Sequence, residues 1–398
     1  SADRREIDLG GDTICPFLRS GAGDEAGEAE PAPRPSGLAL EAHAGRVATL
    51  LEREDMIEQL VRNPRLIGRF QDDVVVLMPL HRLTERLAAP ILSRTLRPLA
   101  LSDRPRIEAA LAAVETPLAH YAFAPHFIWR GLLDYGWTEL AGHLCLFVAS
   151  PDGFFMPLPP VGPEACFAEA VTQAFAFMRE RNKGSAVTRI ENVPDALAPP
   201  LESMGYLLKP KDPDYLYRTE DLAGLAGDRY KSHRALCNQF VRTQTFRYDP
   251  YRDEDREGCM ALYRRWRAQQ EARGAVLDRT ARWMLQDAEQ AHAEALTHHQ
   301  ALGLTGRVVR IQDRIQAYTF GYARSASVFC VLLEVADRSV PGLAQLIFRE
   351  FCREAAARGY ASINTMDDAG LPGLAWSKQA YHPIALIPAY VATEPGQE

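Results

Sequence analysis

The residues best suited to chemistry gather in one short stretch, residues 360–383, with the sequence YASINTMDDAGLPGLAWSKQAYHP. A short apolar run ends at Asn364, and the adjacent carboxylates Asp367 and Asp368 follow it. Glycines and a proline then mark a turn into a helical segment that carries one cation, Lys378. Because functional residues are often carried on loops between rigid elements, this strand-to-helix turn predicts a polar functional site.

These residue types suit the transfer of an activated acyl group, which needs an aligned acceptor, a proton acceptor and a group that stabilises the developing oxyanion. Lys378 is expected to bind that oxyanion or an anionic acceptor. Asp367 and Asp368 are expected to hold an amino group, or one of them to act as the base. Glu334 is a further candidate, because a charge seldom ends a buried strand without a partner. The structural alternative is a surface lysine beside carboxylates that cap a turn.

A second group of polar residues lies on the strand predicted at 315–323. Tyr318 and Tyr322 alternate with Phe320, so the three side chains share one face of the strand, as core or as the wall of a pocket. The seven cysteines are scattered and contain no CxxC pair. They predict reduced core thiols, with neither zinc nor disulfides.

Composition limits the class of protein. The chain has 398 residues, 47% of them hydrophobic and 24% charged, which predicts a globular protein of about two to three domains. Its net charge is −7, but residues 1–30 hold eight acids against three arginines, so the rest is close to neutral and a nucleic-acid partner stays open. With no apolar run of membrane-spanning length and no signal pattern, we expect a cytoplasmic protein with at most peripheral membrane contact.

The pattern along the chain predicts several units. Residues 1–37 are typical of a disordered acidic tail, and residues 38–99 predict a helical N-terminal extension. From residue 100 strands and helices alternate, which predicts an α/β fold with mixed sheets. The order strand-strand-strand-helix-strand-helix-strand in the second half resembles a GNAT acyltransferase. We therefore expect two tandem GNAT-like units, at 100–222 and 223–398, with the catalytic site in the second.

The stretch at 360–383 also resembles the closing motif of the phosphatidylglycerol lysyltransferase C-terminal domain family. That motif has Asn-Arg-Glu-Asp-Asp at a strand end, a Leu-Gly turn, a Gly-Leu pair, a Lys and Tyr-x-Pro. The residues that match it are Asn364, Asp367, Asp368, Gly370, Gly373, Leu374, Lys378, Tyr381 and Pro383. Thr365, Met366 and Ala375 replace the usual Arg, Glu and Arg, which suggests an amino acid and an acceptor that differ from those of lipid-modifying relatives.

Further blocks match the family in the right order, so the resemblance covers most of residues 100–393. They are FAPHFIWR at 123–130, DYLYRTEDLAGLAGDRYKSHRALCNQF at 214–240 and LLEVADRSVPGLAQLIFREF at 332–351, with Val335 in place of a usual Lys. The resemblance implies an aminoacyltransferase that uses aminoacyl-tRNA. The implied acceptor is a hydroxyl or amine, on a phosphatidylglycerol-type head group or, slightly favoured without a membrane domain, on a soluble small molecule.

Residues and resemblance together give one set of candidates. The candidate catalytic residues are Lys378, Asp368, Asp367 and Glu334. The candidate substrate-binding residues are Asn364, Tyr381, Tyr318, Lys231, Arg234 and Asn238. His382, which precedes the proline of the closing motif, is expected to be structural.

The basic helix predicted at 228–243 is relevant to which acyl donor the protein uses. Its cations and interleaved aromatic residues suit phosphates and a stacked base, or else form a solvated face between two units. The turn ADRSVPGLAQ at 336–345 is where a GNAT enzyme would cradle the pyrophosphate of acyl-CoA. It has one glycine, Gly342, while Pro341 removes a backbone donor, so we expect no bound cofactor.

Two alternatives remain open from the sequence. One is an acyl-CoA-dependent N-acyltransferase whose degenerate turn still binds CoA. The other is a non-catalytic module that binds RNA or a partner. The sequence specifies neither the amino acid nor the oligomeric state.

Overall fold

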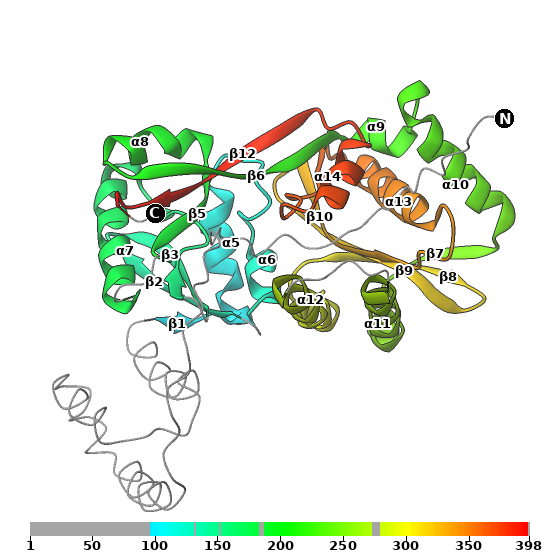
Figure 1. The fold of residues 1–398 in the computed structure, drawn as a ribbon, viewed down its shortest axis with the longest axis horizontal. Coiled ribbons are helices and arrows are strands. Elements are labelled where there is room, and N and C mark those ends of the chain that lie inside the picture. Colours follow the sequence, from blue (N-terminus) through cyan, green and yellow to red (C-terminus); the bar gives the residue numbers. More distant parts are fainter. Residues whose placement is uncertain (1–95, 131–132, 151–152, 183–186, 273–278, 397–398) are drawn as a thin grey trace, which may run out of the picture. The chain divides into compact units, whose positions relative to one another are not determined.

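The computed structural model describes residues 96–396, apart from short gaps at 131–132, 151–152, 183–186 and 273–278. The predicted acidic tail and nearly all of the predicted N-terminal helical extension lie outside the described residues. Within the described part, helices and mixed sheets alternate as predicted (Figure 1). None of the helices in this part combines the length and the apolar character needed to span a bilayer.

The described strands form one four-stranded sheet, in the order β1-β2-β3-β4, and one eight-stranded sheet. The strands are β1 (Arg97–Pro98), β2 (Asp134–Leu140), β3 (His143–Ser150), β4 (Gly153–Phe155), β5 (Arg189–Pro194), β6 (Leu207–Arg218), β7 (Phe246–Pro250), β8 (Thr305–Ile311), β9 (Arg314–Ala323), β10 (Val328–Ala336), β11 (Ser362–Asn364) and β12 (Ala385–Thr393).

Most of the helices lie where the periodicity of the sequence predicts a helix. They are α5 (Arg104–Ala112), α6 (Phe123–Ile128), α7 (Phe167–Asn182), α8 (Ala198–Ser203), α9 (Thr219–Gly224), α10 (Lys231–Thr243), α11 (Arg256–Ala272), α12 (Arg279–His298), α13 (Leu343–Ala357) and α14 (Pro372–Gln379). For α13, the sequence pattern predicts a helix over about 341–358 that turns Leu343, Leu346, Ile347 and Phe351 inward and ends at Gly359, and the structure confirms it. Its apolar residues at helical spacing are buried, and Gly359, with φ 86°, follows its C-terminal end.

The eight-stranded sheet has the order β5-β12-β6-β11-β10-β9-β8-β7. Strand β12 therefore lies between β5 and β6, and the long strand β6 pairs with both β12 and β11 (Figure 1). The run β8-β9-β10-α13-β11-α14-β12 confirms the GNAT-like order predicted for the second half. The boundary predicted between the two units, after residue 222, stays a prediction.

Strands β10 and β11 separate soon after they meet. They pair in parallel only from Val328 to Cys330, while β10 continues to Ala336. The register between β10 and its other neighbour, β9, also shifts between Val331 and Leu333. The second half of β10 therefore has no pairing with β11, and Glu334 lies in that half.

Two local predictions need correction. The pattern at 138–150 predicts a single strand, but Ala141 and Gly142 have positive φ angles and form a turn that divides it into β2 and β3. The pattern at 214–219 also predicts a strand, but β6 begins much earlier, at Leu207. Prolines in the segment before Asp214 conceal the strand pattern, because proline donates no ladder hydrogen bond.

Candidate functional site

The loop that joins β11 to α14, residues 365–371, is called the acidic loop here. Three short polar side chains hold its backbone, each by accepting the amide N–H of the residue two positions further on. The oxygens are Oδ1 of Asn364 (2.6 Å), Oδ1 of Asp367 (3.0 Å) and Oδ1 of Asp368 (2.9 Å). These local bonds are the reason Asn and Asp suit tight turns, and each aspartate retains a second oxygen for another partner.

Lys378 fixes the acidic loop from the side of α14. The side chain is 8% exposed, and its ammonium donates hydrogen bonds to the carbonyl oxygens of Thr365 (2.6 Å), Met366 (3.1 Å) and Asp367. An ammonium group has three N–H donors, so these three carbonyls match its capacity. Met366 has φ 64°, a left-handed conformation that costs energy in a non-glycine residue and that the lysine helps to hold. The geometry therefore favours a positioning role for Lys378.

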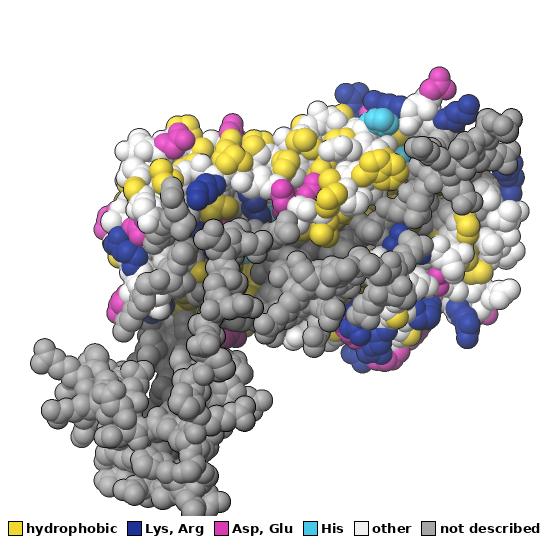
Figure 2. Space-filling model, viewed as in Figure 1, with side chains coloured by type: hydrophobic (Ala, Val, Ile, Leu, Met, Phe, Trp, Pro, Cys, Tyr) yellow, Lys and Arg dark blue, Asp and Glu magenta, His cyan; other side chains and the backbone are white. Residues whose placement is uncertain are grey.

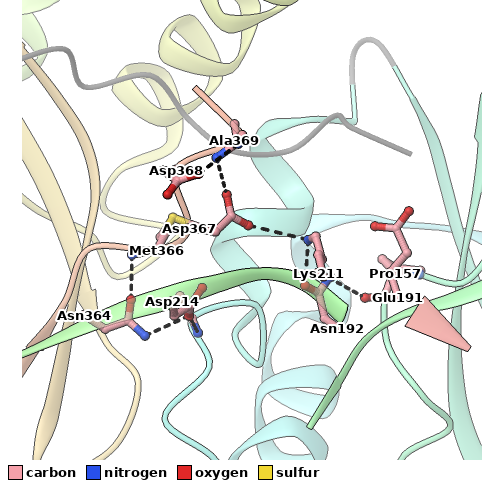
Figure 3. A network of polar contacts seen from close by, with 12 residues as sticks. Pro157, Glu191, Asn192, Lys211, Asp214, Asn364, Met366, Asp367, Asp368 and Ala369 are labelled. Atoms are coloured by element: carbon pink, nitrogen blue, oxygen red, sulfur yellow. Dashed lines mark hydrogen bonds and ion pairs between the residues drawn. The ribbon is translucent and has the colours of Figure 1, made fainter. Parts of the chain in front are cut away.

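Asp367 faces a second lysine, which the sequence analysis did not identify. Lys211 on β6 has its Nζ 3.6 Å from Oδ2 of Asp367 and 2.8 Å from Oδ1 of Asn192 on β5 (Figure 3). Burial raises the pKa of Asp367 to about 7, while Lys211 and Lys378 act in the opposite direction. Asp367 therefore lies in a buried polar network that connects β5, β6 and the acidic loop.

A third buried carboxylate, Asp214 on β6, anchors the start of the acidic loop. Its Oδ2 accepts the N–H of Ala119 and the side-chain amide of Asn364, both at 2.8 Å (Figure 3). The same amide also donates to the carbonyl of Pro117 at 2.8 Å. Burial raises the pKa of Asp214, and its charge adds to the rise in the pKa of Asp367. Asn364 is thus fully engaged inside the protein, where it holds the loop.

Asp368 pairs with a tyrosine of the neighbouring strand. The hydroxyl of Tyr215 donates to Oδ2 of Asp368 at 2.6 Å, and the ammonium of Lys378 lies 5.6 Å from the centre of the tyrosine ring. Burial and this carboxylate raise the pKa of Tyr215. At neutral pH the phenol therefore stays protonated and continues to donate.

Glu334 differs from the carboxylates of the acidic loop in its surroundings. It lies in the part of β10 that has separated from β11 and is 8% exposed. Burial raises its pKa to about 8, and Thr319 on β9 opposes that rise. Among the described residues, its Oε2 has no hydrogen-bond partner. A buried polar atom without a partner requires an explanation, and a bound ligand would supply one.

The other predicted site residues lie in different surroundings. Tyr381 follows α14, half-buried, with its ring 4.2 Å from His233 and 4.9 Å from Phe348. Tyr318 is fully buried in the core, where its hydroxyl lies 2.8 Å from Nδ1 of His292. Burial lowers the pKa of His292 to about 3, so its imidazole is neutral near pH 7.

Helix α10 carries the remaining candidates. Arg234 donates to the backbone carbonyls of Leu225 and Gly227, so it holds the preceding loop. Lys231 and Asn238 are exposed on the same helix. No described contact connects these three residues, or Tyr318, to the acidic loop. The structure thus brings together Asn364, Asp367, Asp368 and Lys378.

The buried acid Asp367 makes stability depend on pH. Its pKa rises from 3.8 to about 7 on folding, so its contribution to stability is complete below pH 4 and is lost as pH rises to 7. We expect Asp367→Asn to gain stability relative to wild type over that range, by at most about 4 kcal/mol for three pKa units. Urea unfolding at pH 4.5 and pH 7.5 measures this difference. An equal difference at both pH values would show that the carboxylate does not titrate in this way.

Comparison with known proteins agrees with the fold. The family model described as "Phosphatidylglycerol lysyltransferase, C-terminal" matches residues 113–393. A conserved protein of unknown function from Bacteroides thetaiotaomicron is similar in structure, with a TM-score of 0.66 at 23% identity; the match covers 75% of this chain and 98% of that one. A search of curated proteins found no match.

Two further structures share the fold at lower identity. The C-terminal domain of a candidate lysylphosphatidylglycerol synthetase from Agrobacterium fabrum has a TM-score of 0.51 at 15% identity, covering 74% of this chain and 92% of that one. The L-PGS of Bacillus licheniformis has a TM-score of 0.51 at 14% identity, covering 74% and 93%. The family match extends over more than half of the sequence, and it includes the acidic loop and Lys378. This chain therefore belongs to the phosphatidylglycerol lysyltransferase C-terminal family, a family of acyltransferases with a GNAT-like fold.

Proposed function

We propose that this protein is an aminoacyltransferase that moves an amino acid from aminoacyl-tRNA to a hydroxyl or amine acceptor. The acceptor is a phosphatidylglycerol-type head group or a soluble small molecule. The main support for aminoacyl-tRNA as the donor, in place of acyl-CoA, is the turn before α13. An acyl-CoA enzyme of this fold would bind pyrophosphate at this turn, and here the turn is closed.

That turn has few groups that could bind a pyrophosphate. Gly342 has φ 81°, and a Cβ at this position would lie 2.3 Å from the carbonyl oxygen of Leu236, so α10 packs directly against the start of α13. Asp337 lies in the same turn, and its carboxylate accepts the N–H (2.9 Å) and the hydroxyl (2.6 Å) of Ser339. Phosphate binding needs accessible backbone N–H groups, and Asp337 already accepts that of Ser339. Both features support a donor without CoA.

An aminoacyl ester needs no further activation, so the chemistry requires few groups. The acceptor oxygen or nitrogen forms a bond to the ester carbonyl carbon, and the bond from that carbon to the ribose oxygen of tRNA breaks. In this proposal Glu334 takes the proton of the acceptor, and the released ribose hydroxyl gains one. The carboxylates of the acidic loop attract the ammonium of the transferred amino acid, and Lys378 keeps that loop in place.

Helix α10 suits the tRNA backbone. Lys231 and Arg242 are exposed on it, and within the described part of the chain neither forms an ion pair. Asn238 is exposed between them and can donate to phosphate oxygens. Exposed cations of this kind give salt-sensitive binding, because each phosphate contact releases counterions.

Binding to bulk aminoacylated tRNA at two salt concentrations, with CoA titrated in parallel, tests the proposal. We expect micromolar binding of tRNA that weakens with salt, and no binding of CoA; the enriched tRNA then identifies the amino acid. The double variant Lys231→Gln, Arg242→Gln should bind tRNA at least threefold more weakly, because two phosphate contacts are lost. Arg314→Gln, at an exposed arginine on β9, is the matched control.

Three outcomes decide between the functions. CoA binding without tRNA binding would favour the acyl-CoA N-acyltransferase. Binding of tRNA without transfer to lipid extracts or soluble acceptors would favour a non-catalytic RNA-binding module. Transfer of a labelled amino acid to either kind of acceptor would establish the enzyme and identify the acceptor class.

A further inference from the structure

The proposed transfer needs a group that stabilises negative charge on the ester carbonyl oxygen. When the acceptor attacks the ester, this oxygen becomes an oxyanion, and positioned donors or cations must stabilise it. Lys378 has its three N–H donors on backbone carbonyls. The backbone N–H groups of Met366, Ala369 and Gly370 are bonded to short side chains nearby. These donors of the acidic loop are thus already used.

Lys211 is a buried cation next to the loop that still has N–H donors to give. Its Nζ lies 2.8 Å from Oδ1 of Asn192 and 3.6 Å from Oδ2 of Asp367. The second distance is that of an ion pair and is too long for a hydrogen bond. Among the described residues, the ammonium therefore uses one of its three donors in a hydrogen bond. The lysine side chain is 13% exposed against 2% for Asp367, so it is the more accessible member of the pair.

Strand pairing places Lys211 at the same end of the sheet as the proposed base. Strands β10 and β11 are parallel, so the acidic loop, which follows Asn364, leaves β11 at the end where β10 carries Glu334. Strand β6 is antiparallel to β11, with Leu216 opposite Asn364. Lys211 precedes Leu216 and therefore lies beyond the end of β11. Figure 3 shows its side chain directed from β6 toward Asp367.

The ammonium of the aminoacyl group fits the neighbouring carboxylate. In the described part of the chain, the side chain of Asp368 has neutral partners, which are the hydroxyl of Tyr215 and the N–H of Gly370. Its charge can therefore receive the ammonium of a substrate, while Asp367 keeps Lys211. In an aminoacyl ester the ammonium nitrogen and the carbonyl oxygen lie roughly 3 Å apart, because both are held through the same Cα. An ammonium bound at Asp368 thus keeps the carbonyl oxygen close to the loop and to Lys211.

We propose that Lys211 is a catalytic residue that binds the carbonyl oxygen of the transferred aminoacyl group and stabilises its oxyanion. This inference rests on the proposed function and assigns to Lys211 the role that the sequence suggested for Lys378. As the acceptor bonds to the carbonyl carbon, an electron pair of the C=O bond moves to the oxygen, and the ammonium donates to it. When the bond to the ribose oxygen breaks, the C=O bond forms again. Lys211 keeps its proton throughout.

Ligand binding to the full chain tests this role without any transfer. Aminomethylphosphonate carries an ammonium and a tetrahedral anionic group on one carbon, like the intermediate, whereas glycinamide carries the same ammonium beside a neutral carbonyl. We expect Lys211→Met to weaken aminomethylphosphonate binding by about tenfold or more, since a charge-assisted hydrogen bond is lost. Glycinamide binding should change by less than about twofold. Lys209→Met, at an exposed lysine of the same strand, is the matched control and should bind both ligands as wild type does.

Transfer kinetics separate catalysis from an effect of Lys211 on Asp367. Without the lysine, Asp367 would lose its cation, so Lys211→Met is also made in the Asp367→Asn chain, where no carboxylate needs one. We expect Lys211→Met to lower kcat by about 10²–10³-fold in both backgrounds, and Lys211→Arg to recover part of the rate. A loss confined to the chain that retains Asp367 would overturn the proposal, because the lysine would then act only through that carboxylate.

The outcomes distinguish this inference from the proposed function. Binding of tRNA should be equal in Lys211→Met and wild type, because the exposed cations proposed for tRNA lie on α10; Figure 2 shows Lys and Arg side chains where Figure 1 places α9 and the start of α10. A wild type that transfers nothing from aminoacyl-tRNA would overturn the proposed function, while the ligand-binding test would still decide the role of Lys211. Equal binding of aminomethylphosphonate by Lys211→Met and wild type would overturn that role, even in an active transferase.

Discussion

Replacement of Lys378 by methionine is expected to lower the free energy of unfolding by about 3–5 kcal/mol and to abolish transfer. Methionine retains much of the side-chain volume, so the loss comes from the ammonium. Without it the carbonyls of Thr365, Met366 and Asp367 lose a charged donor in a buried position. The left-handed residue Met366 would then relax, and both carboxylates of the acidic loop would move.

Urea unfolding monitored by tryptophan fluorescence measures the loss of stability, and a transfer assay measures activity. Lys209→Met is the matched control, because that lysine is exposed on β6 and its replacement should change stability by less than about 0.5 kcal/mol. Wild-type stability in Lys378→Met combined with loss of transfer would contradict the positioning role. The ammonium would then act on the substrate, as the sequence first suggested.

Substitution of Glu334 by glutamine is expected to lower kcat by about 10²–10⁴-fold while the melting temperature stays equal or rises. Burial raises the pKa of Glu334 to about 8, so near pH 7 the side chain is mainly a neutral acid, and a neutral amide of the same shape replaces it at little structural cost. A base works when deprotonated, and the pKa of Glu334 is about 8. The wild-type rate should therefore rise as pH increases through 8.

Single-turnover transfer from purified aminoacyl-tRNA between pH 6 and pH 9 measures this dependence. Glu220→Gln, at an exposed glutamate on α9, is the control and should retain both the rate and the profile. If Glu334→Gln keeps the wild-type rise near pH 8, the titrating group lies elsewhere. Asp367, with a pKa of about 7, would be the next candidate.

Most of the fold follows from local patterns in the sequence. The helical spacing of α13 and the glycine after it depend on residues close together in the chain, and both are strong local signals. The closing motif likewise identifies Asp367, Asp368 and Lys378 as neighbours, because strand, loop and helix follow one another directly.

The partners of these residues could not be predicted from local patterns. Lys211 and Asp214 meet Asp367 and Asn364 only because β6 pairs with β11 and β12, and pairing between distant strands leaves no periodic signal. The role of Lys378 also depends on where its side chain points. A lysine near the end of a short helix has the same sequence signature whether it faces solvent or three carbonyls.

The position of β12 between β5 and β6 has a consequence for biosynthesis. During translation β5 and the first part of β6 emerge long before β12, and until then each has an unpaired edge in the place that β12 will fill. The sheet cannot be completed until β12, which is far away in the sequence, has been synthesised. This delay slows folding and leaves apolar strands open to aggregation. A nascent chain arrested before residue 385 should therefore depend on chaperones far more than the released protein does.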